Sequence, residues 1–373
     1  MKIGLITFHN TANYGAALQT YALQHFLDIN GYDSTYINYV NSVRRHQYDM
    51  FYHILENIKD RKYKSAVTFA LGSPFMFLRK KRFSRFYNQY VSVTKEIYRD
   101  SVQAKSLNKV FDVFIVGSDQ VWNPGNNGKD MAYLLDFVDD DKLKMSYSSS
   151  FGLKTIPSDL SAQYKKCLSR FDYLAVRETE GQSIIKELTG RDAQLVLDPV
   201  FLLKKEDWES FSSRDLHKEK YVFSYTNRPN QMKDFVRQTG FSMQNLKHYK
   251  LARNTNPSDF ISKDTKVMYT MSPIDFLHTI QNAELVVTAS FHCMALSIVL
   301  HKPFIAVLIG DEGKDSRLVS LLKELNLENR IFTSQMTLKD VNTPINYQEV
   351  EQKLDEMRHS SIDYLTSSLK LKI

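Results

Sequence analysis

A single histidine, His292, lies at a joint between two apolar runs of the chain. The stretch around it reads TASFHCMAL, with AELVV before it and SIVLHKPFIAV after it. This pattern predicts a buried strand that leads into a helix, with His292 at the strand end. An imidazole there can transfer a proton near neutral pH, the amides of a helix N-terminus suit a phosphate, and Ser290 could contact the same substrate. A lone histidine between apolar elements is also commonly a hydrogen-bonded core residue, and Cys293 is expected to be a small buried residue.

Three basic side chains could bind an anionic substrate. Arg177 follows a short apolar run in AVRETEG, and a guanidinium at a strand end can hold a carboxylate or phosphate through two parallel hydrogen bonds. The alternative is a surface ion pair with Glu178 or Glu180. Lys314 and Arg317 lie in GDEGKDSR, whose glycines are too close together for a phosphate-binding P-loop, although both cations could serve the same site.

The loop HNTANYGA (residues 9–16) follows the first apolar run and precedes a helical pattern. Gly15 would let a ligand approach the backbone at a helix N-terminus, where free amides favour anions. Asn10 and Asn13 are candidate substrate contacts, and they are equally typical of turn and helix-cap residues. The loop does not match the G-x-G-x-x-G fingerprint of dinucleotide-binding proteins.

A second polar loop, GSDQVWNP, follows the apolar run 110–116. Ser118, Asp119 and Gln120 are suited to bind sugar hydroxyls, and Trp122 could stack on a sugar ring. In the alternative interpretation, Ser118 or Asp119 caps the next turn and Trp122 fills the core.

The elements that must position these residues form two successive α/β series. KIGLITF, a helical pattern up to Gly31, and STYINYV indicate a strand–helix–strand unit, and a second series starts at residue 221. The sequence therefore predicts an α/β protein with two Rossmann-like domains that face each other across a cleft. The expected domains are residues 1–205, with a basic helical insertion at about 41–105, and residues 206–345, followed by a C-terminal helix (346–373) that packs back on the first domain.

Composition excludes several classes of protein. The chain of 373 residues has 43% hydrophobic residues and two cysteines, so neither a disordered chain nor a disulfide framework is expected. No ligand spacing for a metal occurs, and we expect no metal or other cofactor. The small number of cysteines favours a reducing, cytoplasmic setting. The N-terminus lacks an apolar signal-peptide core, so no signal peptide is expected, and the run 65–78 is too short to span a bilayer.

Positive charge is concentrated in one segment. Residues 41–110 contain 15 Lys and Arg against 5 Asp and Glu, while the whole chain has a net charge of +7. No nucleic-acid-binding motif accompanies this charge, so no nucleic-acid partner is expected. A solvated face and an oligomer contact are alternatives to a surface that rests on anionic lipid at the inner membrane, for which FMFLRKKRFSRFYNQY (75–90) has suitable aromatic and basic residues.

Taken in order, seven motifs resemble those of the polysaccharide pyruvyl transferase family. They run from the first predicted strand to about Arg330, and they are TFHNTANYGAALQTYAL, DVFIVGSDQVWN, SYSSSFG, VRETEG, LDPVFLL, SFHCMALSIVLHKPFI and KDSRLVSLLKELNLENR. The resemblance implies a fold like that of the GT-B glycosyltransferases. It also implies transfer of a pyruvyl group from phosphoenolpyruvate to a sugar, as a ketal, with release of phosphate.

The resemblance also implies roles for individual residues. His292 corresponds to the family's acid/base histidine and Arg177 to its donor-binding arginine, with Lys314 and Arg317 as further phosphate contacts. The facing wall, on the side of an oligosaccharide or lipid-linked glycan acceptor, would comprise Asn13, Gly15, Ser118, Asp119 and Gln120.

Two other functions fit the same fold. One is a GT-B-type glycosyltransferase that uses a nucleotide sugar, and the other is a non-catalytic sugar-binding protein. The donor that the protein consumes would separate the first alternative from a pyruvyl transferase.

Overall fold

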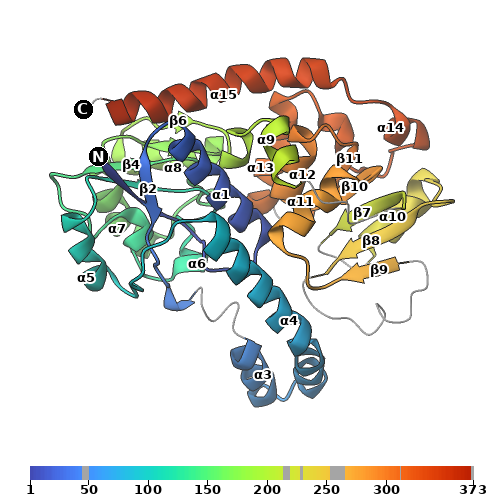
Figure 1. Ribbon diagram of the computed structural model, residues 1–373, viewed down its shortest axis with the longest axis horizontal. Coiled ribbons are helices and arrows are strands. Elements are labelled where there is room, and N and C mark those ends of the chain that lie inside the picture. The colour runs from blue at the N-terminus through green and yellow to red at the C-terminus, as the bar shows by residue number, and fades with distance from the viewer. Residues whose placement is uncertain (44–49, 213–218, 227–229, 253–264, 311, 371–373) are drawn as a thin grey trace. The chain divides into compact units, whose positions relative to one another are not determined.

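The computed structural model describes residues 1–43, 50–212, 219–226, 230–252, 265–310 and 312–370. The chain divides into two compact units, in which segments distant in sequence come together (Figure 1). Unit 1 comprises Met1–Tyr48, Tyr87–Leu202 and Asp355–Ile373, and unit 2 comprises Asp49–Phe86 and Leu203–Leu354.

Unit 1 is built on a parallel sheet with the strand order β2-β1-β3-β4. A short parallel pair, β5-β6, continues from β4 through single bridges. Because helices cover both faces of a parallel sheet, its central strands read as unbroken apolar runs, and VFIV in β3 is buried throughout. The strands are β1 (Lys2–Ile6), β2 (Asp33–Tyr36), β3 (Val113–Val116), β4 (Leu143–Ser146), β5 (Ala175–Val176) and β6 (Gln194–Leu195).

The helices of unit 1 connect successive strands, as in other parallel α/β sheets. They are α1 (Tyr14–Ile29), α5 (Ser101–Ala104), α6 (Pro124–Asn127), α7 (Ser158–Leu168) and α8 (Thr179–Thr189), with the 3-10 helices η1 (Lys105–Lys109), η2 (Ala132–Leu134) and η3 (Pro199–Phe201). Residues 355–370 of α15 (Tyr347–Lys370) belong to the same unit. They are anchored there by Tyr364, whose hydroxyl donates to the Ser146 carbonyl (2.7 Å).

Unit 2 contains a five-stranded parallel sheet in the order β11-β10-β7-β8-β9. Read from its other edge, this is the 3-2-1-4-5 order of a Rossmann fold. The strands are β7 (Tyr221–Tyr225), β8 (Lys247–Leu251), β9 (Thr265–Met268), β10 (Leu285–Thr288) and β11 (Phe304–Ala306). A core cluster beneath the sheet includes Val222, Phe235 and Val287, all buried.

The helices of unit 2 include the basic segment. They are α3 (Met50–Lys59), α4 (Tyr63–Tyr90), α9 (Lys205–Phe211), α10 (Gln231–Thr239), α11 (Pro273–Gln281), α12 (Phe291–Val299), α13 (Glu312–Glu324), η5 (Glu328–Arg330) and α14 (Leu338–Asn342), and the first part of α15. We expected the helical insertion to belong to the N-terminal domain. Residues 49–86 instead cluster with unit 2, because α4 docks on this unit through Arg79, which donates to the Ala252 carbonyl (3.4 Å).

Each sheet has one point at which the strand order reverses direction. In unit 1 it lies between β1 and β3, and in unit 2 between β7 and β10. Ligands of open α/β sheets bind outside the carboxyl ends of the strands at such switch points. The loops that follow β1 and β3, and the loop that follows β10, are therefore the places to look for a site.

Candidate active site

The loop after β3 in unit 1 is held in an unusual backbone conformation. The peptide bond between Gly117 and Ser118 is cis, Gly117 has φ +139°, and Asp119 has φ +73°. A Cβ atom on Gly117 would lie 1.9 Å from the carbonyl oxygen of Tyr147, so only glycine fits. Ser118 is fully buried, and its carbonyl accepts a hydrogen bond from the Thr7 hydroxyl at the end of β1 (2.8 Å).

Arg177 lies directly after β5 and is buried among three carboxylates. Its Nη1 is 2.6 Å from Asp198 Oδ2, its Nη2 is 3.8 Å from Asp119 Oδ1, and its Nε is 4.0 Å from Glu178 Oε2. Burial alone lowers the pKa of Arg177, but the attraction of Asp198, Glu178 and Asp119 outweighs it, so the pKa lies above its ordinary value. The alternative of a surface ion pair is wrong, since the Arg177 side chain is only 3% exposed.

Asp198 is the residue of this cluster that the sequence did not reveal. It follows β6 and caps η3, where its Oδ1 accepts from the Val200 amide (3.2 Å). Its other oxygen accepts from the Ser118 hydroxyl (3.0 Å) as well as from Arg177. In the sequence, Asp198 stands between an apolar run and a proline in LDPVFLL. This pattern is equally typical of an ordinary cap residue, so it did not indicate a role in the site.

The loop after β1 supports the start of α1. Asn13 is the N-cap, and its side-chain oxygen accepts from the amides of Gly15 (3.0 Å) and Ala16 (3.4 Å). Asn10 donates to the side chain of Asn38 (2.9 Å), in the segment after β2. The Asn13 side-chain oxygen therefore caps the helix, as one of the two interpretations of this residue predicted. Gly15 lies in the first turn of the helix.

His9, in the same loop, is buried. Its Nδ1 donates to the Thr7 carbonyl (3.2 Å). Burial lowers the pKa of His9 to about 4, although the hydrogen bonds to Thr7 and Asn38 oppose part of this effect. His9 is thus neutral at pH 7 and adds no positive charge to unit 1.

Gln120 and Trp122 differ in their surroundings. The Gln120 side chain packs against Gly152, which has φ +60° and no room for a side chain on that side. Trp122 is fully buried, donates from Nε1 to the Tyr133 carbonyl (2.8 Å) and packs against Phe151. Trp122 is therefore a core residue, and the hypothesis that it stacks on a sugar is wrong.

In unit 2, His292 belongs to the connection between β10, one of the two strands at the switch point, and α12. The strand β10 ends at Thr288, Ser290 is the N-cap of α12, and His292 lies in the first turn of this helix. Within the described part of the chain, the Ser290 side chain accepts no hydrogen bond from that turn. The first amides of a helix lack acceptors inside it, so this turn offers donors and the positive end of the helix dipole. The His292 side chain is buried against the Phe291 ring, with the two ring planes nearly perpendicular.

Arg317 brings a positive charge to the same turn. It lies in α13, and its guanidinium carbon is 6.0 Å from the centre of the Phe291 ring. The preceding loop is ordered by Asp315, whose carboxylate accepts from the amides of Ile309 (3.1 Å) and Gly310 (2.8 Å). The backbone of Lys314 belongs to α13, but its side chain lies outside the described residues.

Cys293 has no acid–base role beside His292. It is fully buried, and burial raises the pKa of its thiol to about 12, despite an opposing interaction with Thr288. The thiol therefore stays protonated at neutral pH and is a poor nucleophile.

The structure thus gathers the predicted residues into two groups. Ser118, Asp119 and Arg177 meet in unit 1, whereas Ser290, His292 and Arg317 lie around one helix terminus in unit 2. That the two groups share one cleft stays a prediction.

The comparison with protein families decides the identity of the chain. The model of the family described as polysaccharide pyruvyl transferase matches residues 13–311, which include the first group of residues and, from the second, Ser290 and His292. The chain belongs to this family. A search by sequence among curated proteins finds no match.

Solved structures with a similar fold agree with a GT-B architecture for this pyruvyl transferase family member. AviGT4, a glycosyltransferase involved in avilamycin A biosynthesis, has a TM-score of 0.52 at 9% identity, with 100% of this chain and 98% of AviGT4 covered. A Listeria monocytogenes structure assigned as a UDP-N-acetylglucosamine 2-epimerase has a TM-score of 0.51 at 10% identity, with coverages of 96% and 90%. At these identities the likeness shows the fold alone. The prediction of two Rossmann-like domains is confirmed.

Proposed function

We propose that this family member transfers a pyruvyl group from phosphoenolpyruvate to two hydroxyls of a sugar in a cell-surface polysaccharide or its lipid-linked precursor. The observation that carries the proposal is the position of His292 in the first turn of α12, next to Phe291, whose ring lies 6.0 Å from the Arg317 guanidinium carbon. Among the described residues, the side chain of the N-cap Ser290 does not cap this turn. Family membership supports the reaction class, and phosphoenolpyruvate itself supplies the leaving group.

The donor side of the proposal lies in unit 2. Phosphoenolpyruvate carries a carboxylate and a phosphate, and the N-terminus of α12 and Arg317 supply positive potential for both. Ser290 and Lys314 are the further proposed contacts. In the proposed step His292 protonates the methylene carbon, which leaves an oxocarbenium-like centre at the neighbouring carbon. One sugar hydroxyl adds there and gives its proton to His292, the bond to phosphate breaks, and a second hydroxyl closes the ketal as its proton passes to the departing phosphate.

The acceptor side lies in unit 1. Carboxylate and hydroxyl oxygens accept hydrogen bonds from sugar hydroxyls, and Ser118, Asp119 and Gln120 follow β3 at the switch point. Asn10 and Asn13 lie in the neighbouring loop, and Gly15 lies in the first turn of α1. We also propose that Arg177, although it lies in unit 1, binds the donor. Its guanidinium orients Asp119 and Asp198 as well.

The direct test is phosphate release from phosphoenolpyruvate in the presence of a panel of acceptor glycans. We expect release that depends on an acceptor, and a loss of roughly 10²–10⁴ in rate for His292→Gln, as is typical when a general acid/base is removed. Lys323→Gln, in the last turn of the same helix as Arg317, serves as the control variant and should keep the rate.

Two outcomes would replace the proposal. Consumption of a nucleotide sugar, with phosphoenolpyruvate left unchanged, would assign a glycosyltransferase. Binding of glycans without turnover of either donor would assign a sugar-binding protein.

A further inference from the structure

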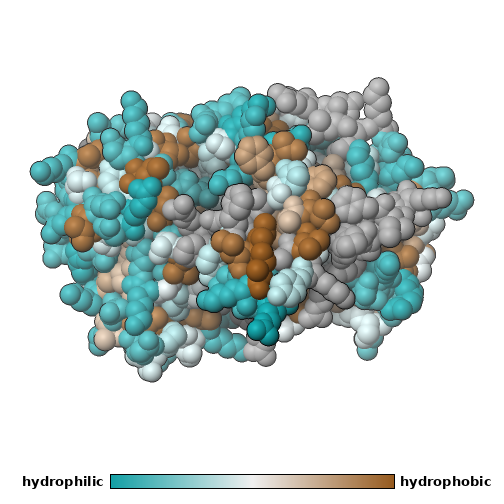
Figure 2. Space-filling model, turned by 90° about the horizontal axis from the view of Figure 1, so that it is seen from below, coloured by the Kyte–Doolittle hydropathy of each residue, from teal (hydrophilic) through white to brown (hydrophobic). Residues whose placement is uncertain are grey.

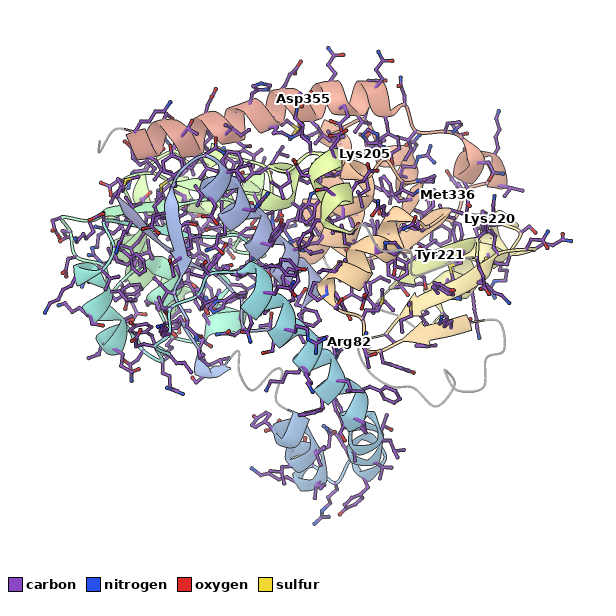
Figure 3. The ribbon with its side chains drawn as sticks, in the orientation of Figure 1. Arg82, Lys205, Lys220, Tyr221, Met336 and Asp355 are labelled. Carbon is purple, nitrogen blue, oxygen red and sulfur yellow. The ribbon has the colours of Figure 1, made fainter. Side chains whose placement is uncertain are left out.

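A face of α4 exposes apolar and basic side chains together. Its buried face, which includes Phe83, Phe86 and Arg79, packs on unit 2. Arg79 donates to the Ala252 carbonyl, and Arg82, labelled in Figure 3, lies 3.3 Å from Asp275 of α11. These contacts fix which side of the helix is turned away from the unit.

The exposed face forms one stripe along the helix. Val67, Leu71, Leu78, Lys81 and Arg85 follow one another at intervals of three, four or seven residues, which places them within a narrow sector of an α-helix. All five are exposed, and Leu71 retains 71% of its accessible surface. We call these five residues the α4 stripe. Its N-terminal part is aliphatic and its C-terminal part is basic.

Neighbouring residues extend the apolar part of the α4 stripe. Phe77 on the same helix is 66% exposed, and on α3 Leu55 is 65% exposed and Ile58 47% exposed. Figure 2 views the molecule from the side on which α3 and α4 lie in Figure 1, and hydrophobic side chains gather in the middle of this face beside hydrophilic ones. When a helix carries apolar side chains on two faces, both faces are ordinarily covered by other groups. The exposed face of α4 is therefore a candidate binding surface.

The charge of α4 selects the kind of partner. The helix has six Lys and Arg and no Asp or Glu. A second copy of the chain on this stripe would bring the same cations against each other, since a two-fold interface pairs a patch with itself. The exposed Val67, Leu71 and Leu78 give a nucleic acid nothing to stack on. These side chains and Phe77 can enter the acyl boundary of a bilayer while Lys and Arg contact anionic headgroups.

We propose that the α4 stripe and α3 bind the surface of a membrane that contains anionic phospholipid. The contact is peripheral, because no helix among the described residues is both long and apolar enough to cross a bilayer. The proposal does not depend on the transfer reaction, and it would hold the protein where a lipid-linked glycan is found.

Flotation of the full-length protein with vesicles tests the proposal. We expect binding to vesicles of phosphatidylcholine mixed with phosphatidylglycerol, little binding to phosphatidylcholine alone, and weaker binding at high salt. Lys81→Gln combined with Arg85→Gln should lower the partition coefficient roughly 30-fold, since each cation near an anionic surface contributes about fivefold. Leu71→Ser should lower it about tenfold or more by removing an inserted aliphatic side chain.

Matched variants in unit 1 provide the controls. Lys105→Gln with Lys109→Gln removes the same charge, and Val102→Ser removes a comparably exposed aliphatic side chain, so neither should change vesicle binding. Equal losses in these controls, or full binding by the α4 variants, would overturn the proposal. A concentration-dependent dimer that Leu71→Ser abolishes, without vesicle binding, would assign the stripe to a second copy. The His292→Gln variant should bind vesicles like the wild type, which separates this proposal from the proposed reaction.

Discussion

The switch points of the two units differ in how the following helix begins. In unit 1 the Asn13 side chain caps α1 and accepts two of its first amides. In unit 2 the N-cap Ser290 makes no such bond among the residues that the structure covers. The first helix terminus is capped by a side chain of the protein itself, and we propose that the second takes an external acceptor such as a phosphate oxygen.

The same contrast appears in the charges. Arg177 in unit 1 faces three carboxylates and His9 is held neutral, so this switch point is acidic. In unit 2, Arg317 lies beside the positive end of the α12 dipole. Positive potential attracts an anion, and carboxylates accept hydrogen bonds from hydroxyls. The charges therefore support the proposal of an anionic donor in unit 2 and a hydroxyl-bearing acceptor in unit 1.

Replacement of two arginines, Arg177 and Arg317, gives the largest expected difference in the free energy of unfolding. Arg177→Met leaves Asp198 buried without its cation and should reduce the free energy of unfolding by about 3–5 kcal/mol, as broken buried ion pairs do. Arg317→Met should cost about 1 kcal/mol or less and should instead raise the KM for phosphoenolpyruvate roughly 10–100-fold. Urea unfolding and steady-state kinetics measure the two effects. Equal stability losses would mean that Arg317 contributes as much to the fold as the buried Arg177 does.

The loop after β3 provides the next comparison. Gly117→Ala adds a clash with the Tyr147 carbonyl to an unfavourable φ, and should destabilise unit 1 by about 4 kcal/mol. Gly190→Ala is the matched control, because Gly190 has φ +74° with no atom within 4 Å of the added Cβ. It should cost about 1–2 kcal/mol. Thermal unfolding of both variants checks the prediction, and similar losses would mean that the loop can move to admit a side chain.

The neutral state of His9 predicts a pH dependence. With a pKa of about 4 in the folded protein and 6.5 in the unfolded chain, the unfolded state binds more protons between these values. Titration of His9 therefore does not change the free energy of unfolding above pH 6.5. As the pH falls from 6.5 towards 4, protonation of the unfolded chain lowers this free energy by on the order of 3 kcal/mol in total.

His9→Gln should flatten this part of the curve, as measured by urea unfolding from pH 4 to 7. His248 in unit 2, whose pKa burial also lowers to about 4, contributes a similar slope that the variant should leave in place. An unchanged slope in His9→Gln would show that His9 is not the buried neutral group described here.

The two N-caps give the smallest difference in stability. Asn13→Ala should lower the free energy of unfolding by about 1 kcal/mol, the usual value of a side-chain cap. Ser290→Ala should change it by a few tenths of a kcal/mol at most, and should raise the KM for phosphoenolpyruvate. A loss of about 1 kcal/mol in Ser290→Ala would mean that its hydroxyl supports α12 after all.

Much of the site could be predicted because the apolar runs of parallel strands end at it. The ends of VFIV and AV located Ser118 and Arg177 correctly after their strands. His292 was expected at the end of LVVT and lies instead in the first turn of the helix that follows it. Asp198 was missed because its importance depends on contacts with Arg177 and Ser118, which lie 21 and 80 residues away. Strand order, and hence the switch points, follows from long-range pairing that no local pattern encodes, and the same is true of the docking of α4 on unit 2.

The location of the donor site is tested most directly by hydrogen exchange of the full-length protein with and without phosphoenolpyruvate. The account predicts slower exchange of backbone amides at residues 289–293, at the start of α12, with the amides at the start of α1 unchanged. Protection at the start of α1 or around Arg177, with no change at residues 289–293, would contradict it.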